Sequence, residues 1–259
     1  MPLRSPDAYI KQTILAVQEY SILSGTAIAA LFSKPRYWAD IFVQMDSIGV
    51  GSMPIIILTG FFTGCVLALQ SETALQSFGA VSMTGSLVSL SMVKELGPVL
   101  TGLMVSGRNA SGIASELGSM KVTEQIDAMR ALGTDPIRKL VTPRIVATVF
   151  MLFFLTIIAD AFGIAGGALV SVTILGLNAS SYLHTSYRSL VHGDIVQGLT
   201  KPLFSGLIIA TVGCYFGMKT TGGTQGVGRA TTQAVVVSSV FIIIVDLLVT
   251  RAMIGIFGN

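Results

Sequence analysis

Long apolar stretches without a charged side chain dominate the chain. Residues 47–71, 73–93, 161–187 and 202–218 contain no Asp, Glu, Lys or Arg. A helix needs about 20 apolar residues to cross the hydrocarbon core of a bilayer. The pattern therefore predicts an all-α polytopic membrane protein.

Polar segments divide the apolar stretches into five expected membrane-spanning helices. We place these spans at about 47–70, 82–108, 145–173, 196–218 and from 234 onward. They are joined by a turn near 72–78, a polar connection at 109–144, a more polar segment at 176–200 and a loop at 219–233. Gly60 with Gly64, and Gly163 with Gly167, form GxxxG pairs, which permit close helix approach but also arise by chance in a glycine-rich chain.

The N-terminal segment predicts a helix that does not cross the membrane. Residues 7–33 carry apolar side chains at helical spacing, but the uncharged part, 20–33, has 14 residues and is too short to span. We therefore place this helix in the membrane interface, with a sixth, strongly tilted span as the alternative. Lys34, Arg36 and Trp38 follow as a basic and aromatic anchor at the headgroup level.

Composition and charge support this assignment and orient the spans. Charged residues make up 11% of the chain, against about 25% in soluble domains, and the mean hydropathy is +0.77. Four Lys or Arg precede residue 37, and six more lie within 108–144. Because Lys and Arg are enriched in cytoplasmic loops, both segments are expected in the cytoplasm and the C-terminus outside.

Several chemistries are not expected of this chain. There is no basic patch interleaved with aromatic residues, so nucleic-acid binding is not expected. Cys65 and Cys214 both lie in apolar stretches and suggest neither a disulfide framework nor a metal site. No GxxxxGK[ST] motif is present, so the chain is expected to hold no ATP or other cofactor itself. An odd number of spans leaves no two equal inverted repeats, which favours a homodimer.

Lys94 and Glu95 lie inside the second expected span. A charge at mid-bilayer costs about 2.5–3.5 kcal/mol on insertion scales and is normally kept for a partner or a wet cavity. Adjacent helical residues point about 100° apart, so at least one of the two must face a polar cavity, another helix or a lipid headgroup. A pair nearer the interface, with Lys94 reaching the headgroups, is the alternative. Gly97-Pro98 is expected to bend the helix beside them.

The connection at 109–144 predicts a polar amphipathic helix over 116–132. Its charged residues are Glu116, Lys121, Glu124, Asp127 and Arg130, with Lys121–Glu124 and Asp127–Arg130 expected as i,i+3 pairs. Ile126, Met129 and Leu132 supply an apolar ridge, and Gly133 with Pro136 ends the helix. Such a helix is suited to insertion into a groove of a partner protein. A helix resting on the surface is the alternative.

Other residues suggest roles that the sequence leaves open. Leu67, Ala74, Leu75 and Phe78 recur at near-helical spacing and suit contact with an acyl chain, although periodicity alone favours core packing. Asp160 and Asp246 are further acids within expected spans. A structural pair between Asp246 and Arg251, five residues on, is as plausible as a transport role.

Four long strings resemble the MlaE (YrbE) family of ABC-transporter permeases. They are KELGPVLTGLMVSGR, ASELGSMKVTEQIDAM, ALGTDP and GGTQGVGRATTQAVVVSS. The resemblance implies a homodimeric, multi-pass inner-membrane permease with an N-terminal interfacial helix and anchor (1–45) and five spans (46–259). It implies a cytoplasmic ATPase that binds ATP and Mg, a STAS-domain protein and a hexameric MCE-domain lipid-binding protein as partners. The implied substrate is phospholipid, moved between inner and outer membrane to maintain outer-membrane lipid asymmetry.

The resemblance also assigns roles by position. Lys94 and Glu95 match the family's charged position in the second span, and 116–132 matches its coupling helix. Leu67, Leu75 and Phe78 align with its lipid-contacting region, Phe78 standing where some members carry Tyr. Asp160 lies where an apolar residue is usual. Three alternatives remain: a permease for another hydrophobic substrate, a secondary transporter using Glu95 and Asp246 as proton sites, and a scaffold that anchors a lipid carrier.

Overall fold

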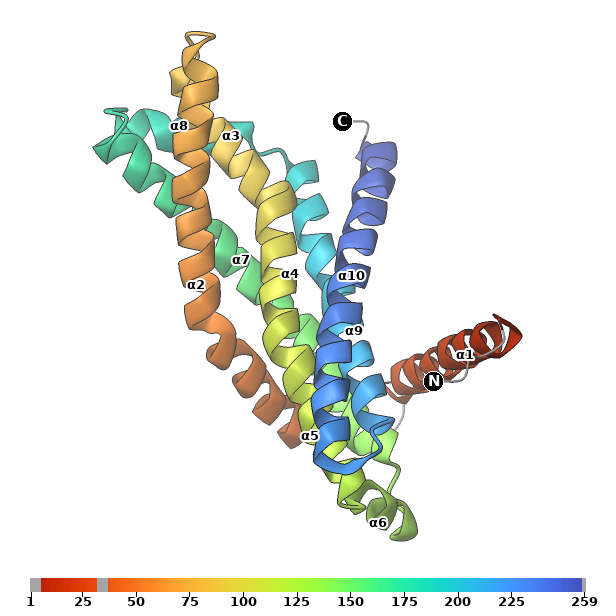
Figure 1. The fold of residues 1–259 in the computed structure, drawn as a ribbon. Coiled ribbons are helices and arrows are strands. Elements are labelled where there is room, and N and C mark those ends of the chain that lie inside the picture. Colours follow the sequence, from red (N-terminus) through yellow and green to blue (C-terminus); the bar gives the residue numbers. More distant parts are fainter. Residues whose placement is uncertain (1–5, 32–36, 258–259) are drawn as a thin grey trace.

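The computed structural model describes residues 6–31 and 37–257, and in this part of the chain every regular element is helical. The elements are α1 (Pro6–Ala30), α2 (Trp38–Gln76), η1 (Val81–Met83), α3 (Thr84–Ser91), η2 (Met92–Leu96), α4 (Gly97–Val105), η3 (Ser106–Ala110), α5 (Ser111–Val122), α6 (Gln125–Ala131), η4 (Ile137–Val141), α7 (Thr142–Thr173), α8 (Ala179–Ser189), α9 (His192–Met218) and α10 (Gly223–Phe257). Segments η1 to α5 form one continuous rod, as do η4 and α7. Long helices therefore run from one end of the molecule to the other (Figure 1).

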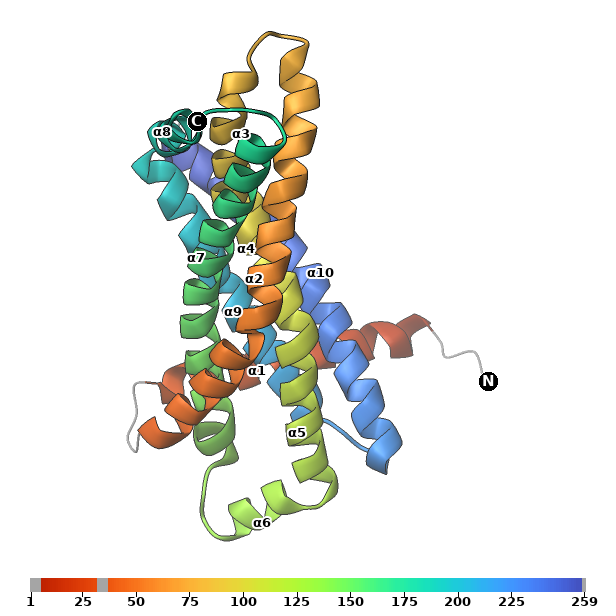
Figure 2. The same cartoon turned by 90° about the vertical axis from the view of Figure 1, so that its left-hand side faces the viewer.

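The expected number of spans is confirmed. Within the described residues, five helical segments are long and apolar enough to cross a membrane, and the N-terminal apolar helix, Ile14–Ala30, is shorter. Helix α1 lies across the bundle rather than along it (Figures 1 and 2). The hydroxyl groups of Tyr20 and Thr211 share a hydrogen bond of 2.7 Å, which holds α1 against α9.

Helices α2 and α7 pack with their backbones in contact, through both GxxxG pairs. A Cβ at Gly64 would lie 1.8 Å from the carbonyl oxygen of Gly163, and one at Gly60 would lie 2.7 Å from that of Ala159. Only glycine allows this approach, so the expected function of the two pairs as packing motifs is confirmed. Larger side chains fill the remaining interior between α2, α4, α7, α9 and α10, including Ile56, Val105, Leu152, Leu155, Ile209 and Ile242.

Several expected boundaries differ from the structure. Helix α2 begins at Trp38, whereas the expected division between the N-terminal anchor and the spans lies between residues 45 and 46. The same helix runs to Gln76, so the turn expected near 72–78 starts only at Ser77. Helix α10 begins at Gly223, so most of the loop expected at 219–233 is helical. Polarity marks where a segment is expected to leave the bilayer, but a helix can continue into water because its backbone hydrogen bonds are internal.

The single helix expected over 116–132 is wrong. The first part belongs to α5, which continues the second span, and α6 begins at Gln125. Glu124 separates them with φ 60, in the left-handed region that a non-glycine residue rarely adopts. The break turns α6 across the end of the bundle (Figure 2). Residues 116–132 are thus a bent pair of helices, and their function as a coupling segment stays a prediction.

Candidate functional site

A widened helical turn positions the two charged residues of the second span. Pro98 has no backbone N–H, so the helix loses a hydrogen bond one turn earlier. The chain responds with the π-helical turn η2, in which the N–H of Gly97 bonds to the carbonyl of Met92. Turns of this kind insert one residue and occur often at functional sites. Lys94 and Glu95 lie within this turn.

Glu95 is bound by polar groups from two other spans. Its carboxylate forms an ion pair with the ammonium group of Lys201 in α9. It also accepts hydrogen bonds from the side-chain amide of Gln197 and the hydroxyl group of Thr250, each at 3.4 Å. Lys201 in turn lies 3.0 Å from a carboxylate oxygen of Asp246 in α10. The turn η2 and helices α9 and α10 therefore meet at one buried lysine.

Lys94 belongs to a second branch of the same cluster. Its ammonium group lies 2.8 Å from the carboxylate of Asp194, in the first turn of α9. The other oxygen of Asp194 accepts a hydrogen bond of 3.1 Å from the N–H of Val191, which caps the helix. The expectation that Lys94 and Glu95 cannot neutralise each other is confirmed, because each has a partner on another helix. We call Lys94, Glu95, Asp194, Lys201 and Asp246 the charged cluster.

Sequence reasoning missed two members of this cluster. Neither Asp194 nor Lys201 is assigned a role in the sequence analysis. Their spacing held a signal, since Asp194, Gln197 and Lys201 stand at i, i+3 and i+7 on one helix face. The open question about Asp246 is answered by its ion pair with Lys201, which brings it into the site instead of leaving it to Arg251.

Exposure within the cluster is uneven. The side chain of Lys201 is 2% exposed and that of Asp246 18%, whereas that of Glu95 is 41% exposed. Glu95 lies about a third of the way along the rod formed by residues 81–122, within the second span. A carboxylate there cannot face lipid tails without a large penalty, so a polar cavity or a second protein surface must cover it. With two lysines and three carboxylates, the cluster can bind a polar or zwitterionic group.

The residues expected to contact an acyl chain do not lie together in the structure. Leu67 packs with Leu96 against the buried side chains of Ala68, Val88, Met92 and Val170, next to the charged cluster. Phe78 follows the end of α2 and its side chain is 83% exposed. About 16 Å of helical rise separates residues 67 and 78. Leu67 therefore belongs to the apolar packing that includes Leu96, the residue after Glu95, whereas Leu75 and Phe78 lie at and beyond the end of α2.

Asp160 lies behind the bend, outside the charged cluster. A Cβ at Gly97 would lie 1.7 Å from a carboxylate oxygen of Asp160, so the acid packs directly on the helix at the glycine. Its side chain is buried, and that oxygen has no hydrogen-bond partner among the described residues. Asp160 thus packs against the bent segment rather than among the polar groups that hold Glu95.

The charged residues of the bent pair α5–α6 form a separate group at the other end of the molecule. Lys121 lies 2.7 Å from Asp127, and Arg130 lies 3.4 Å from the same carboxylate. The Asp127–Arg130 pair is as expected, but Lys121 bonds to Asp127 across the break instead of to Glu124. The hydrogen bond from Lys121, with the charge of Arg130, lowers the pKa of Asp127 below its ordinary value.

Glu116 fixes this end of the bundle to a neighbouring span. Its carboxylate lies 2.7 Å from the guanidinium group of Arg144, a buried residue near the start of α7. Arg144 also donates a hydrogen bond of 2.7 Å to the carbonyl of Leu140. The rod that ends in α5 carries Lys94 and Glu95 further along its length, in η2. Helix α5 and Glu95 are therefore parts of one continuous element, to which α6 is joined by the Lys121–Asp127 ion pair.

Comparison with known proteins gives consistent matches. Residues 41–252 match the family model described as Permease MlaE. The chain is 44% identical to a probable ABC transporter permease protein of Rickettsia bellii, covering 93% of this chain and 94% of the relative. It is 35% identical to the intermembrane phospholipid transport system permease protein MlaE of Haemophilus influenzae (87% and 88% covered). It is also 35% identical to protein TRIGALACTOSYLDIACYLGLYCEROL 1 of Arabidopsis thaliana (93% and 68% covered).

Proposed function

The chain belongs to the MlaE permease family, and on that premise we propose that it carries phospholipid between the inner and outer membranes of a bacterium. As the permease subunit of an ABC transporter it would thereby maintain outer-membrane lipid asymmetry. The Haemophilus influenzae relative, named as an intermembrane phospholipid transport permease, supports this substrate class. The observation that carries the proposal is the half-exposed Glu95, held by Lys201 inside a helical membrane bundle.

A phospholipid matches the two kinds of surface that meet at this point. Its headgroup carries a phosphate and, in zwitterionic lipids, an ammonium group, which complement the lysines and carboxylates of the charged cluster. Its acyl chains require an apolar wall, to which Leu96, the residue after Glu95, and Leu67, packed against the same buried side chains, would contribute. Lys94, whose side chain is 28% exposed, supplies the donor for the phosphate. Substrates without a polar head, the alternative class, would leave the exposed part of the Glu95 side chain against apolar groups.

A second copy of the chain completes the proposed cavity. Glu95 is 41% exposed in the single protomer, and a mid-membrane carboxylate must be covered by polar surface or water. A homodimer with Glu95 facing the dimer axis provides such a cavity. The remaining proposed partners are a cytoplasmic ATPase that binds ATP and Mg, a STAS-domain protein and a hexameric MCE-domain protein outside.

The proposed transport cycle starts at α6, which we place in the cytoplasm. Closure of the two ATPase subunits on ATP would displace α6, and the Lys121–Asp127 ion pair would transmit this to α5. The rod from α5 to η2 would then shift Lys94 and Glu95 relative to α9. The chain itself performs no chemistry in this cycle; its residues bind the headgroup and change the shape of the cavity.

Reconstituted transport tests the proposal. The full complex in liposomes is expected to move labelled phospholipid on ATP addition, with Glu95→Gln lowering the rate at least about tenfold, the loss of one charged hydrogen bond. Glu72→Gln, at the end of α2, is the matched control. Transfer driven by a proton gradient without ATP would instead establish the secondary transporter, and full activity of Glu95→Gln would contradict the site.

A further inference from the structure

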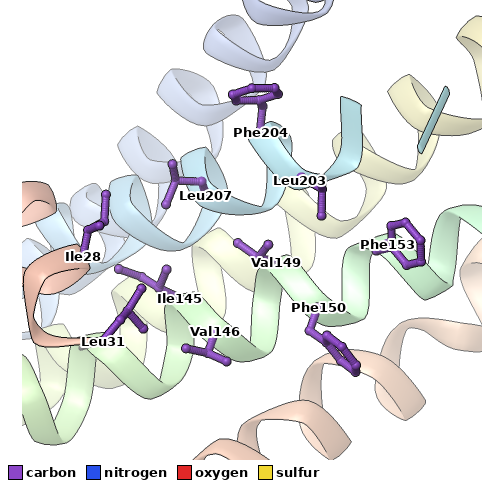
Figure 3. A pocket seen from close by; sticks show the side chains of 10 residues that line it. All are labelled: Ile28, Leu31, Ile145, Val146, Val149, Phe150, Phe153, Leu203, Phe204 and Leu207. Atoms are coloured by element: carbon purple, nitrogen blue, oxygen red, sulfur yellow. The ribbon is translucent and has the colours of Figure 1, made fainter. Parts of the chain in front are cut away.

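An open apolar groove lies on the outer surface of the bundle, away from the charged cluster. It has a volume of about 620 Å³ and runs between α7, α9 and the end of α1. Figure 3 shows Ile28 and Leu31 closing one end, with Val149 and Phe153 along α7 and Leu207 on α9. Every residue that lines it is aliphatic or aromatic without a polar atom in its side chain.

The groove has the dimensions of an acyl chain in one leaflet. From residue 145 to residue 153 α7 rises about 12 Å, close to half of the roughly 30 Å hydrocarbon core. Helices α7 and α9 are both spans, so the groove opens into the bilayer. An empty apolar groove would lose its dispersion contacts, and lipid tails are the mobile apolar material available there.

A second pocket supplies a polar end. It has a volume of about 320 Å³ and shares Leu31 and Val146 with the apolar groove. It is lined by Tyr37, Trp38 and Arg138, residue types that occur at the headgroup level of membranes. Arg138 lies 3.3 Å from Asp135 and its side chain is 43% exposed. Because this side chain is partly exposed, its guanidinium group is accessible to a phosphate, with which it forms charge-assisted hydrogen bonds.

The groove is separate from the charged cluster. Lys201 and Leu203 are two residues apart on α9, about 200° around the helix axis. Lys201 is buried in the cluster, whereas Leu203 is 41% exposed and lines the groove. A lipid in the groove therefore lies on the opposite face of α9 from Glu95 and is not in the proposed transport cavity.

We infer that the apolar groove between α1, α7 and α9, together with the pocket at Arg138, binds one glycerophospholipid of the surrounding bilayer. One acyl chain lies against Val149 and Phe153, and the phosphate lies at Arg138. The bound lipid fastens α1 to the bundle, adding to its hydrogen bond between Tyr20 and Thr211. The site depends only on the chain spanning a membrane and not on the transported substrate.

Photocrosslinking from the protein identifies the occupant. A photoreactive benzoylphenylalanine replaces Phe150, which lines the groove, in the full complex in native membranes. We expect a crosslink to phospholipid, detected as a mass increase on the peptide that contains this position. A crosslink to a transmembrane helix of another protein or of a second copy would overturn the inference.

Two substitutions test the two halves of the site by native mass spectrometry of the complex in nanodiscs. Val149→Phe fills the groove, and Arg138→Gln removes the phosphate contact; each is expected to lower retention of one phospholipid per protomer about tenfold. The controls are Leu169→Phe, which is exposed elsewhere on α7, and Arg188→Gln on α8. Arg138→Gln changes an exposed side chain, so it remains informative if Val149→Phe fails to fold. Unchanged retention in Arg138→Gln would overturn the assignment of the headgroup.

Discussion

Lys201, with only 2% of its side chain exposed, is ion-paired with Glu95 across two membrane-spanning helices. The same ammonium group lies 3.0 Å from Asp246, so one lysine separates two carboxylates. Removing one partner of a buried ion pair leaves the others uncompensated. Three spans are therefore joined at a point where the energetic consequences of a single substitution are large.

Replacing Lys201 by Met is expected to destabilise the protein by about 3–5 kcal/mol, because Glu95 and Asp246 would lose their common cation. Thermal denaturation of the purified protein measures the change. Lys219→Met is the control, since Lys219 is 53% exposed and its ion pair with Glu19 is worth about 1 kcal/mol or less.

Neutralising Lys201 together with its two carboxylate partners separates stability from function. In Lys201→Met combined with Glu95→Gln and Asp246→Asn, no buried charge is left unpaired, so much of the lost stability is expected to return. Lipid transfer by the reconstituted complex that carries the triple variant is nevertheless expected to be absent. Equal melting temperatures for Lys201→Met and Lys219→Met would contradict the assigned role of the ion pair.

Substitution of Gly64 by Ala is expected to separate α2 from α7. The added Cβ would lie 1.8 Å from the carbonyl oxygen of Gly163, and backbone cannot move aside as a flexible side chain can. We expect a loss of about 1–3 kcal/mol or more in unfolding free energy. Gly25→Ala, which meets no atom within 4 Å, should leave stability unchanged or raise it by up to about 1 kcal/mol. If Gly25→Ala lowered the unfolding free energy more than Gly64→Ala does, the close packing of α2 against α7 would be refuted.

Glu124 is expected to be a position where glycine stabilises the protein. Its φ of 60 costs a residue with a Cβ about 1 kcal/mol, and Glu124→Gly removes this cost. Gln125→Gly, one residue on and inside α6, is expected to destabilise by about 1 kcal/mol. Hydrogen exchange of α5 and α6 distinguishes the two variants. Faster exchange in Glu124→Gly than in the unchanged protein would contradict the left-handed conformation assigned to Glu124.

Charge reversal at Asp127 is expected to uncouple ATP hydrolysis from lipid transfer. Asp127→Lys breaks the contacts with Lys121 and Arg130 and places three cations together, so α6 can move without α5. The reconstituted complex should hydrolyse ATP while transfer falls. Glu124→Lys makes the same charge change but breaks no ion pair in the described part of the chain, so it should have the smaller effect. Equal effects would show that surface charge alone matters.

The same contacts predict a pH dependence at this end of the molecule. Lys121 holds the pKa of Asp127 below its ordinary value of 3.8. A carboxyl group with a lowered pKa in the folded state stabilises above its unfolded pKa, and this contribution is lost as the pH falls through the folded one. Protection of α6 from hydrogen exchange should therefore be constant at neutral pH and fall only below about 4. In Lys121→Met the protection of α6 should begin to fall at a higher pH, because the pKa of Asp127 is no longer lowered by Lys121.

The sequence by itself determined the class of protein, the number of spans and the short N-terminal helix. These depend on local quantities, since a bilayer requires about 20 apolar residues in succession whatever the rest of the chain does. It also placed Lys94 and Glu95 inside a span and showed that they cannot pair with each other. The two GxxxG pairs were visible as well, although chance remained an equal explanation for them.

Only the tertiary structure decided which groups meet. Whether Lys201 reaches Glu95, or Asp246 reaches Lys201 instead of Arg251, depends on the rotation and register of α9 and α10 against η2. Those follow from packing between distant segments, which no local pattern encodes. The break at Glu124 has the same origin, because Lys121 can bond to Asp127 only if the chain leaves the helical path between them.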